Sequence, residues 1–204
     1  GGMFTSTNRD IESDQLSFLN KSAYTGGVDF RHRWADKTYS LTASTAFSKV
    51  NSSAEGILGQ QLSSRRYYQR PDADYVSVDS SMTSLSGHGG YFSLSRSGNN
   101  RLRMNAGFMW RSPGLELNDV GFMRQADRMM QWTWAGYRIT EPFSIFRNLN
   151  LNFNQWAGWN FGGDNLFAGG NINGGGSLKN YWSIWGGIGR EVSNLSTTAL
   201  RGGP

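Results

Sequence analysis

The chain has 204 residues, of which 37% are hydrophobic, with a mean hydropathy of −0.52 and a formal net charge of +5. No apolar run approaches the ~20 residues of a transmembrane helix. The absence of cysteine excludes a disulfide framework and a thiolate metal site, and His32 and His88 are too few for a His-rich metal centre. The 14% aromatic content and the 27 Gly against 4 Pro favour extended strands with tight turns over disorder.

Alternation of apolar and polar residues predicts about nine strands. They cover residues 1–7, 22–34, 37–50, 75–96, 101–112, 128–140, 148–161, 165–178 and 180–192. Several reach about 12–14 residues, more than the roughly 5–6 of ordinary globular strands. This length suits a tilted bilayer crossing, which takes about 9–11 residues.

Residues 39–48 show the alternation most clearly. Tyr39, Leu41 and Phe47 occupy one face, and Thr42 and Ser44 occupy the other. The same period predicts which side chains face lipid and which face a lumen. The lipid-facing set includes Leu41, Phe47, Met104, Phe108 and Leu151, and the lumen-facing set includes Thr42, Ser44, Arg103 and Asn105.

The predicted connections alternate in length. Residues 35–37 and 97–100 are short turns, whereas residues 8–21, 51–74 and 113–127 are long loops. Within the second loop, residues 54–68 carry apolar residues at helical spacing, so a helix and an irregular segment are both open there. Outer-membrane barrels have short periplasmic turns and long extracellular loops. We therefore place the turns inside and the loops outside, with residues 162–164 as an unusually short outer loop.

Aromatic positions agree with that orientation. Trp110 ends one predicted strand and Trp132 and Trp134 begin the next, so we expect all three near the outer membrane boundary. Trp34 and Tyr39 flank a short turn, where they would form the inner aromatic girdle. The alternative is a soluble sheet that uses Trp as core.

These patterns favour an all-β fold. We expect residues 1–204 to form part of one antiparallel transmembrane β-barrel domain, about nine strands of a larger up-and-down barrel. Residues 1–10 lack the basic and apolar regions of a signal peptide, and the last residues lack a terminal strand. We therefore expect the chain to be a piece of a larger exported barrel.

One loop gathers charges of both signs. Residues 113–127 contain Glu116, Asp119, Arg124 and Asp127. Paired carboxylates can catalyse glycoside hydrolysis, but neighbouring opposite charges more often hold a loop in place. The loop also carries Leu115, Leu117, Val120, Phe122 and Met123, too many apolar residues for disorder. We expect it to be ordered, packed against residues 51–74, and to be the best ligand-site candidate.

Two further groups of side chains are candidates. Arginine and tyrosine mix at Arg65, Arg66, Tyr67, Tyr68 and Arg70, a combination that can stack sugars or hold anions. The alternative role is to pin the long loop to the barrel wall. Lumen charges are expected at Asp29, Arg31, Arg33, Arg101 and Arg103, where they would tune ion selectivity or form an ion-pair ladder. No Ser–His–Asp triad, catalytic residue or nucleic-acid motif is predicted.

Four strings resemble a known family. They are residues 67–73 (YYQRPDA), 83–87 (TSLSG), 111–122 (RSPGLELNDVGF) and 200–204 (LRGGP). In this order they resemble a barrel domain of unknown function found in Gram-negative outer-membrane proteins, where it usually follows a family-nine-like carbohydrate-binding module. The resemblance implies that this module and further strands lie outside the sequence. It supplies no reaction to carry over.

The expected function follows from these patterns and the resemblance together. We expect an outer-membrane protein that takes part in transport or surface binding of glycan-derived material, with membrane lipid and a glycan as partners. No cofactor, metal or nucleic acid is expected. An outer-membrane polysaccharide hydrolase and a soluble β-sandwich binding module remain the alternatives.

Overall fold

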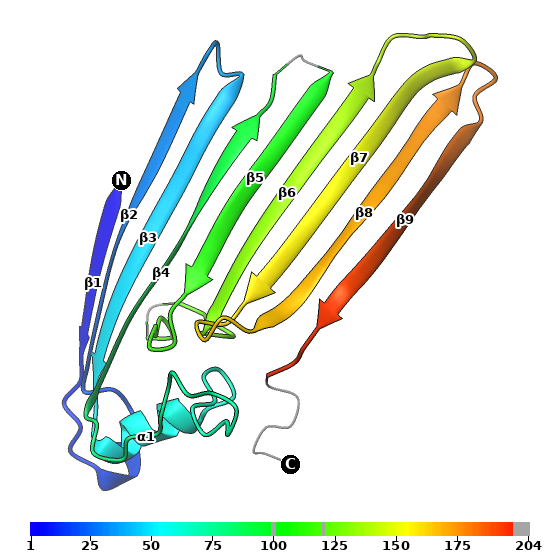
Figure 1. Ribbon diagram of the computed structural model, residues 1–204. Helices are drawn as coiled ribbons and strands as arrows, with labels where there is room; N and C mark the ends of the chain where they lie inside the picture. The colour runs from blue at the N-terminus through cyan, green and yellow to red at the C-terminus, as the bar shows by residue number, and fades with distance from the viewer. Residues whose placement is uncertain (99–100, 120, 198–204) are drawn as a thin grey trace.

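The computed structural model describes residues 1–98, 101–119 and 121–197, in which nine antiparallel strands form one open sheet (Figure 1). The strands follow one another in chain order, so each pairs with its sequence neighbours. They are β1 (Gly2–Asn8), β2 (Ser22–Trp34), β3 (Tyr39–Asn51), β4 (Ser84–Arg96), β5 (Leu102–Arg111), β6 (Arg128–Ile139), β7 (Phe146–Trp159), β8 (Asn165–Leu178) and β9 (Ser183–Asn194). The prediction of an all-β chain with about nine strands is confirmed. The described residues contain no second sheet, which a β-sandwich would require.

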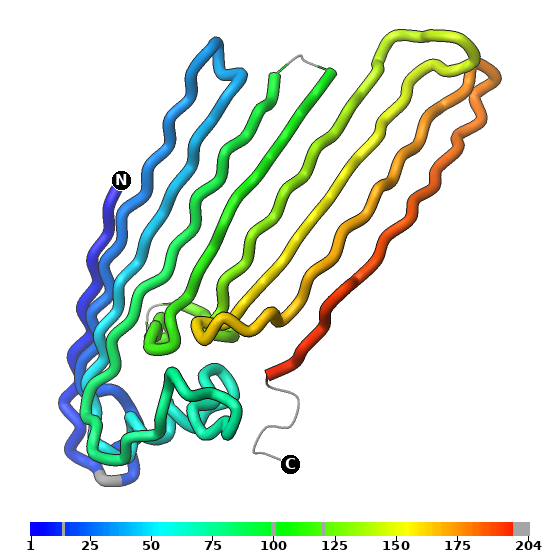
Figure 2. Tube along the Cα trace, in the orientation of Figure 1, coloured from blue at the N-terminus to red at the C-terminus, as the bar shows by residue number. Residues whose placement is uncertain are grey.

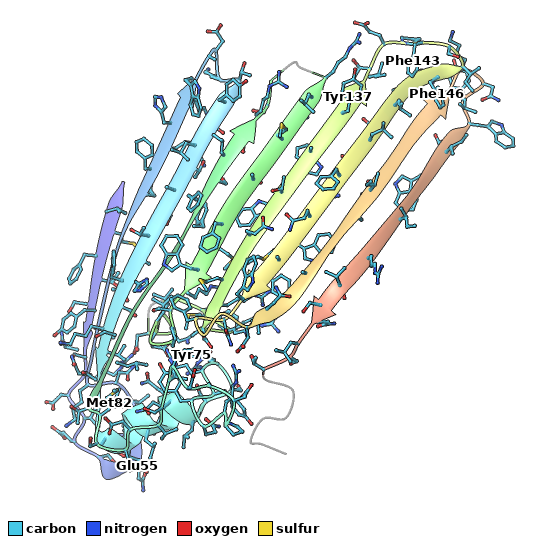
Figure 3. All side chains as sticks on the ribbon, viewed as in Figure 1. Glu55, Tyr75, Met82, Tyr137, Phe143 and Phe146 are labelled. Carbon is cyan, nitrogen blue, oxygen red and sulfur yellow. The ribbon has the colours of Figure 1, made fainter. Side chains whose placement is uncertain are left out.

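The connections gather at two ends of the sheet. At the end that we call the turn end lie residues 35–38, 97–101, 140–145 and 179–182, and at the loop end lie residues 9–21, 52–83, 112–127 and 160–164. Figure 2 shows the long loops together below the strands. Figure 3 labels Tyr137, Phe143 and Phe146 at the turn end, and Glu55, Tyr75 and Met82 at the loop end. The predicted alternation of short and long connections is confirmed, although residues 99–100 of one turn lie outside the described residues.

The register gives the sheet two different faces. Leu41 pairs with Leu94 on one face, and Thr42 pairs with Ser93 on the other. Because directly paired residues share a face, the alternation predicted from the sequence extends across the sheet. What we call the apolar face carries Phe4, Val28, Phe30, Leu41, Phe47, Phe92, Leu94, Met104, Phe108, Leu151, Phe153, Ile172 and Ile188. It is widely exposed, with Phe4 at 70% and Ile188 at 79%.

The opposite, polar face carries amides and indoles. Trp134 Nε1 donates to Asn152 Oδ1 (3.2 Å), and Asn152 Nδ2 donates to Asn173 Oδ1 (3.0 Å). Trp132 Nε1 donates to Asn105 Oδ1 (2.6 Å). The prediction that Trp132 and Trp134 belong to an outer girdle is therefore wrong, because both share the face of Asn105. By contrast, Trp34 and Tyr39 stack at the turn end, with ring centroids 5.6 Å apart.

Strand β4 is shorter than predicted. Residues 75–83 lie outside it. At Asp79 the side chain of Gln61 occupies the place of a strand partner: its amide nitrogen donates to Asp79 O (2.9 Å) and its oxygen accepts from Asp79 N (2.8 Å). Glycine in this strand allows close packing of the third loop. A Cβ on Gly89 would lie 2.8 Å from Leu115 Cδ2, so the glycine leaves room for the loop above it.

One short α-helix, α1 (Ala54–Leu62), follows β3 in the long second loop. Ser53 caps it, its hydroxyl accepting from Gly56 N (3.0 Å). Fully buried Ile57 packs with Ala23, Val50 and Leu85 at the loop end. Of the two possibilities that the sequence left open for residues 54–68, the structure has the helix, over Ala54–Leu62. A single turn of 3-10 helix, η1 (Asp14–Leu16), lies in the first loop.

Among the described residues, no helix is both long and apolar enough to span a membrane.

Candidate functional site

The predicted site residues meet in one interlocked layer at the loop end. We call it the loop cap: residues 9–21, 52–83 and 112–127, of which Val120 lies outside the described residues. The cap sits on the polar face, because Ala23, Val50 and Leu85, which contact α1, occupy polar-face positions in β2, β3 and β4. The third loop contacts the second, as predicted, since Arg66 donates to Leu115 O and to Glu116 Oε2.

The apolar residues of the third loop divide into two groups. Leu115 and Met123 are 2% and 3% exposed and pack with Ala126. Phe122, in contrast, is 83% exposed and does not take part in this packing. The loop backbone is also tied to the sheet, since Glu116 N donates to Ser48 Oγ on β3 (2.9 Å). The loop is therefore ordered by both burial and hydrogen bonds.

Glu116 forms the central ion pair of the cap. Its carboxylate lies 2.9 Å from Arg66 Nη2 and 3.8 Å from Arg65 Nη2, with the side chains of Glu116 and Arg66 only 2% and 0% exposed. Arg66 Nη2 also donates to Leu115 O. Burial alone would raise the pKa of Glu116, but Arg66, the N–H of Asn118 and Arg65 outweigh it and hold the pKa below its usual range.

Arg66 uses only part of its hydrogen-bonding capacity. Among the described residues, its Nε and Nη1 and the Nε of Arg65 are buried without a hydrogen-bond partner. Burial lowers the pKa of Arg66, yet a guanidinium titrates so far above neutrality that it stays charged. The pair fastens the third loop to the second, at the cost of desolvating both charges.

Asp119 fastens the third loop to the first. Its carboxylate lies 2.6 Å from Arg9 Nη1 and also accepts a hydrogen bond from Asn20 Nδ2. Asn20 Oδ1 in turn accepts from Gln60 Nε2 of α1 (2.6 Å). Sequence reasoning missed Arg9 and Asn20, which belong to a loop that was assigned no role.

Asp127 and Arg70 connect the cap to the β7–β8 connection. Asp127 Oδ2 accepts from Tyr75 Oη (2.5 Å), and its Oδ1 accepts from Phe161 N (2.9 Å). Burial, and then this hydrogen bond, raises the pKa of Tyr75 well above its usual range. Arg70 pairs with Asp72 (2.9 Å) and approaches Asp164 (3.9 Å). Tyr75 is a third cap residue that sequence reasoning missed, after Arg9 and Asn20.

The remaining predicted ligand residues have mixed environments. Tyr67 and Tyr68 are buried, at 5% and 9% exposure, and Tyr67 has a left-handed φ of 59°. Burial raises the pKa of Tyr68. Arg124 is exposed. The cap thus brings together nearly all the predicted ligand residues, but it pairs Glu116 and Asp119 with its own arginines and Asp127 with Tyr75. Ligand contact at these residues stays a prediction.

Four of the five predicted lumen charges share one face of the sheet. Asp29, Arg31 and Arg33 on β2 and Arg103 on β5 are exposed side chains of the polar face. Arg101 precedes β5 and pairs with Glu141 across the turn end at 3.7 Å. The turn-end half of the polar face is therefore basic. The described residues contain no group of three or more His, Asp or Glu side chains that could hold a metal ion.

Comparison with known proteins supplies a family. Residues 17–194 match the family described as a domain of unknown function (DUF5916). The chain belongs to this family. No curated protein matches the chain, and no solved structure does. The membership agrees with the resemblance to a domain of unknown function and assigns no activity. Of the four strings that carry the resemblance, residues 67–73 lie in the cap, residues 111–122 lie mostly there, residues 83–87 lead into β4, and residues 200–204 lie outside the described residues.

Proposed function

We propose that the chain is part of an outer-membrane β-barrel, with the apolar face against lipid and the polar face around a lumen, in a protein for transport or surface binding of glycan-derived material. The observation that carries the proposal is the pair of chemically opposite faces, both uncovered over most of the sheet. A soluble sheet would bury such an apolar face, since exposed apolar patches of this extent are rare on monomers.

The apolar residues of the apolar face form a band across the sheet, and the edge of this band that is nearer the loop end supports the proposal. Lys49 on β3 and Arg190 on β9 are the charged residues of the apolar face nearest the loop end on their strands, and we take them to mark the edge of the band. Successive pairing connects Arg190 to Gly170, Gln155, Thr133, Ala106, Leu94 and finally Leu41. The edge has therefore moved along β3 from position 49 to position 41, a shift of 49 − 41 = 8 residues, between β3 and β9.

This offset converts into a strand tilt. With about 3.4 Å per residue and about 4.8 Å between strands, the edge rises about 27 Å over about 29 Å of sheet. A level membrane boundary then requires strands tilted by about 43°, and transmembrane barrels tilt by about 35–45°. The first and last strands, β1 and β9, each keep an unpaired edge within the described residues. A barrel requires that further strands pair there, because a lipid-exposed edge is unfavourable.

Cysteine labelling tests the proposal, because the chain has no cysteine of its own. Ala43→Cys and Ser44→Cys place one thiol on the apolar or the polar face of β3. In protein reconstituted into vesicles, a water-soluble maleimide should label Ser44→Cys and spare Ala43→Cys. Both should label after denaturation. Equal labelling of the two in the folded protein would reject a lipid-facing apolar side.

A further inference from the structure

The turn-end half of the polar face contains a groove outside the loop cap. It has a volume of about 510 Å³ and spans β5 to β9. This volume lies within the roughly 300–1,000 Å³ of small-molecule sites. Its side chains of interest are Trp134, Trp185, Arg103, Arg138, Asn150 and Asn152. None of them was predicted from the sequence to bind a ligand. Arg103 was predicted only to face a lumen.

The two indoles form flat apolar surfaces at opposite sides of the groove. The ring of Trp134 lies over Gly136, where a Cβ would be 2.5 Å from its Cζ2. Trp185 is 79% exposed, and its Cδ1 lies 3.1 Å from where a Cβ of Gly175 would stand. From β6 to β9 the distance is about 14 Å at the usual strand spacing, longer than one sugar ring. The electron-rich face of an indole attracts C–H groups, which the faces of pyranose rings present.

Polar groups stand between and beside the indoles in two rows, with the asparagines on β7 and the arginines on β5 and β6. Register aligns Arg138 with Asn150, Gly175 and Trp185. The neighbouring row contains Arg103 and Asn152, on either side of Gly136. Asn152 is held by hydrogen bonds to Trp134 and Asn173. Among the described residues the amide of Asn150 has no hydrogen-bond partner, so it can donate to and accept from a hydroxyl.

The charge of the groove selects the ligand class. Arg103 and Arg138 are exposed, and neither forms an ion pair within the described part of the chain. No described lining residue is acidic. A guanidinium binds a carboxylate through two parallel hydrogen bonds. A ligand that suits the groove therefore combines ring faces for the indoles, hydroxyls for the amides and carboxylates for the arginines.

We propose that this groove binds an acidic oligosaccharide, with pyranose rings against Trp134 and Trp185 and a carboxylate on Arg103 and Arg138. The inference rests on the proposed function, since it names the glycan class and places it on the lumen side. It locates recognition on the rigid sheet, away from the loop cap.

Titration calorimetry on the full-length protein folded in detergent micelles tests the site. The probes are an oligogalacturonate, a neutral malto-oligosaccharide of equal length and inorganic phosphate. We expect the oligogalacturonate to bind and the other two to bind at least tenfold more weakly. Arg103→Gln and Trp185→Ala should each weaken binding about tenfold, the loss expected for one charge-assisted hydrogen bond or one aromatic contact.

Matched controls lie on the same sheet. Arg31→Gln removes an exposed polar-face arginine on β2, and Trp182→Ala removes a 73% exposed indole that does not line the groove. Both should bind as the unchanged protein does. Equal affinity for the neutral sugar would overturn the acidic class. Phosphate binding insensitive to Trp185→Ala would overturn a saccharide site, and so would absence of binding in the folded protein.

The outcomes separate this inference from the barrel proposal. Failure of binding together with the alternating cysteine labelling of Ala43→Cys and Ser44→Cys would reject the groove and leave the barrel. Binding with the expected variant pattern, but equal labelling of the two cysteines, would reject the barrel and leave the groove.

Discussion

Placing an arginine on either face of one strand tests the membrane assignment energetically. Leu94 and Ser93 are adjacent in β4 and lie on opposite faces, the first paired with Leu41 and the second with Thr42. Neither side chain makes a hydrogen bond within the described residues. They are better suited than Met104 and Asn105, because Asn105 accepts from Trp132 and its loss would have a separate cost.

The expected penalty can be worked out from the exposure. Leu94 is 49% exposed, so about half of its side chain contacts lipid if the proposal holds. Losing that half costs roughly 1 kcal/mol, given about 1.5–3 kcal/mol for a whole apolar side chain. An arginine at the midplane costs about 2–4 kcal/mol more. Leu94→Arg should therefore destabilise the folded protein by about 3–5 kcal/mol, and Ser93→Arg, facing water, by less than about 1 kcal/mol.

Folding into lipid vesicles from urea measures this difference, with heat-modifiable gel migration and tryptophan fluorescence as independent readouts. The midpoint of folding should shift strongly for Leu94→Arg and little for Ser93→Arg. Equal shifts would show that the apolar face does not meet lipid. A larger shift for Ser93→Arg would show that the two faces have been assigned to the wrong environments.

Three further outcomes test the loop cap and the polar face. Arg66→Met should leave Glu116 buried without its nearer cation, with only Arg65 at 3.8 Å. This should cost about 3–5 kcal/mol, seen as faster proteolysis of the cap, and adding Glu116→Leu to Arg66→Met should restore most of the protection. Because the pKa of Glu116 is lower in the folded protein than in the unfolded chain, its ionised carboxylate stabilises the cap at pH values above the unfolded-state pKa of about 4.3. This stabilisation is lost as the pH falls through the folded-state pKa, so proteolysis of the cap should rise only below about pH 4. Glu116→Gln should flatten this pH dependence. Gly136→Ala should displace Trp134, lower the free energy of unfolding by about 1–3 kcal/mol and change the tryptophan fluorescence. Gly186→Ala, with nothing within 4 Å of its added Cβ, should change neither the stability nor the fluorescence.

The strands were predictable because alternation is a local property. Each arm of a hairpin shows its own apolar side, so the bounds of β2, β6 and β8 follow from neighbouring residues alone. The contacts of the cap are of another kind. Arg9 and Asp119 are 110 positions apart, and Arg66 and Glu116 are 50 apart. Charges in loops carry no period that would predict which of them meet.

The tryptophans of β6 show where local pattern was ambiguous. Trp132 and Trp134 share their parity with Arg138, whereas the opposite parity contains Ala135 and Tyr137. Both sides of the strand therefore looked partly apolar, and the position of the Trp pair near a strand start favoured a girdle. The charge of Arg138 was the available clue that this side is the polar one. The hydrogen bonds that Trp132 and Trp134 donate to Asn105 and Asn152 show that both indoles lie on the polar face, and the alternation of residue types does not predict such bonds.

Along β3 the apolar residues change sides, and this change argues for two environments. Phe47 lies on the apolar face and is 60% exposed, whereas Val50 lies on the polar face and is 1% exposed. Val50 pairs with Ala23 and Leu85, and Ile57 of the cap covers all three. A strand in one uniform setting has no reason to reverse its apolar side within three residues. A strand that leaves lipid on one side and meets a folded loop on the other requires this reversal, so the cap begins where the proposed lipid contact ends.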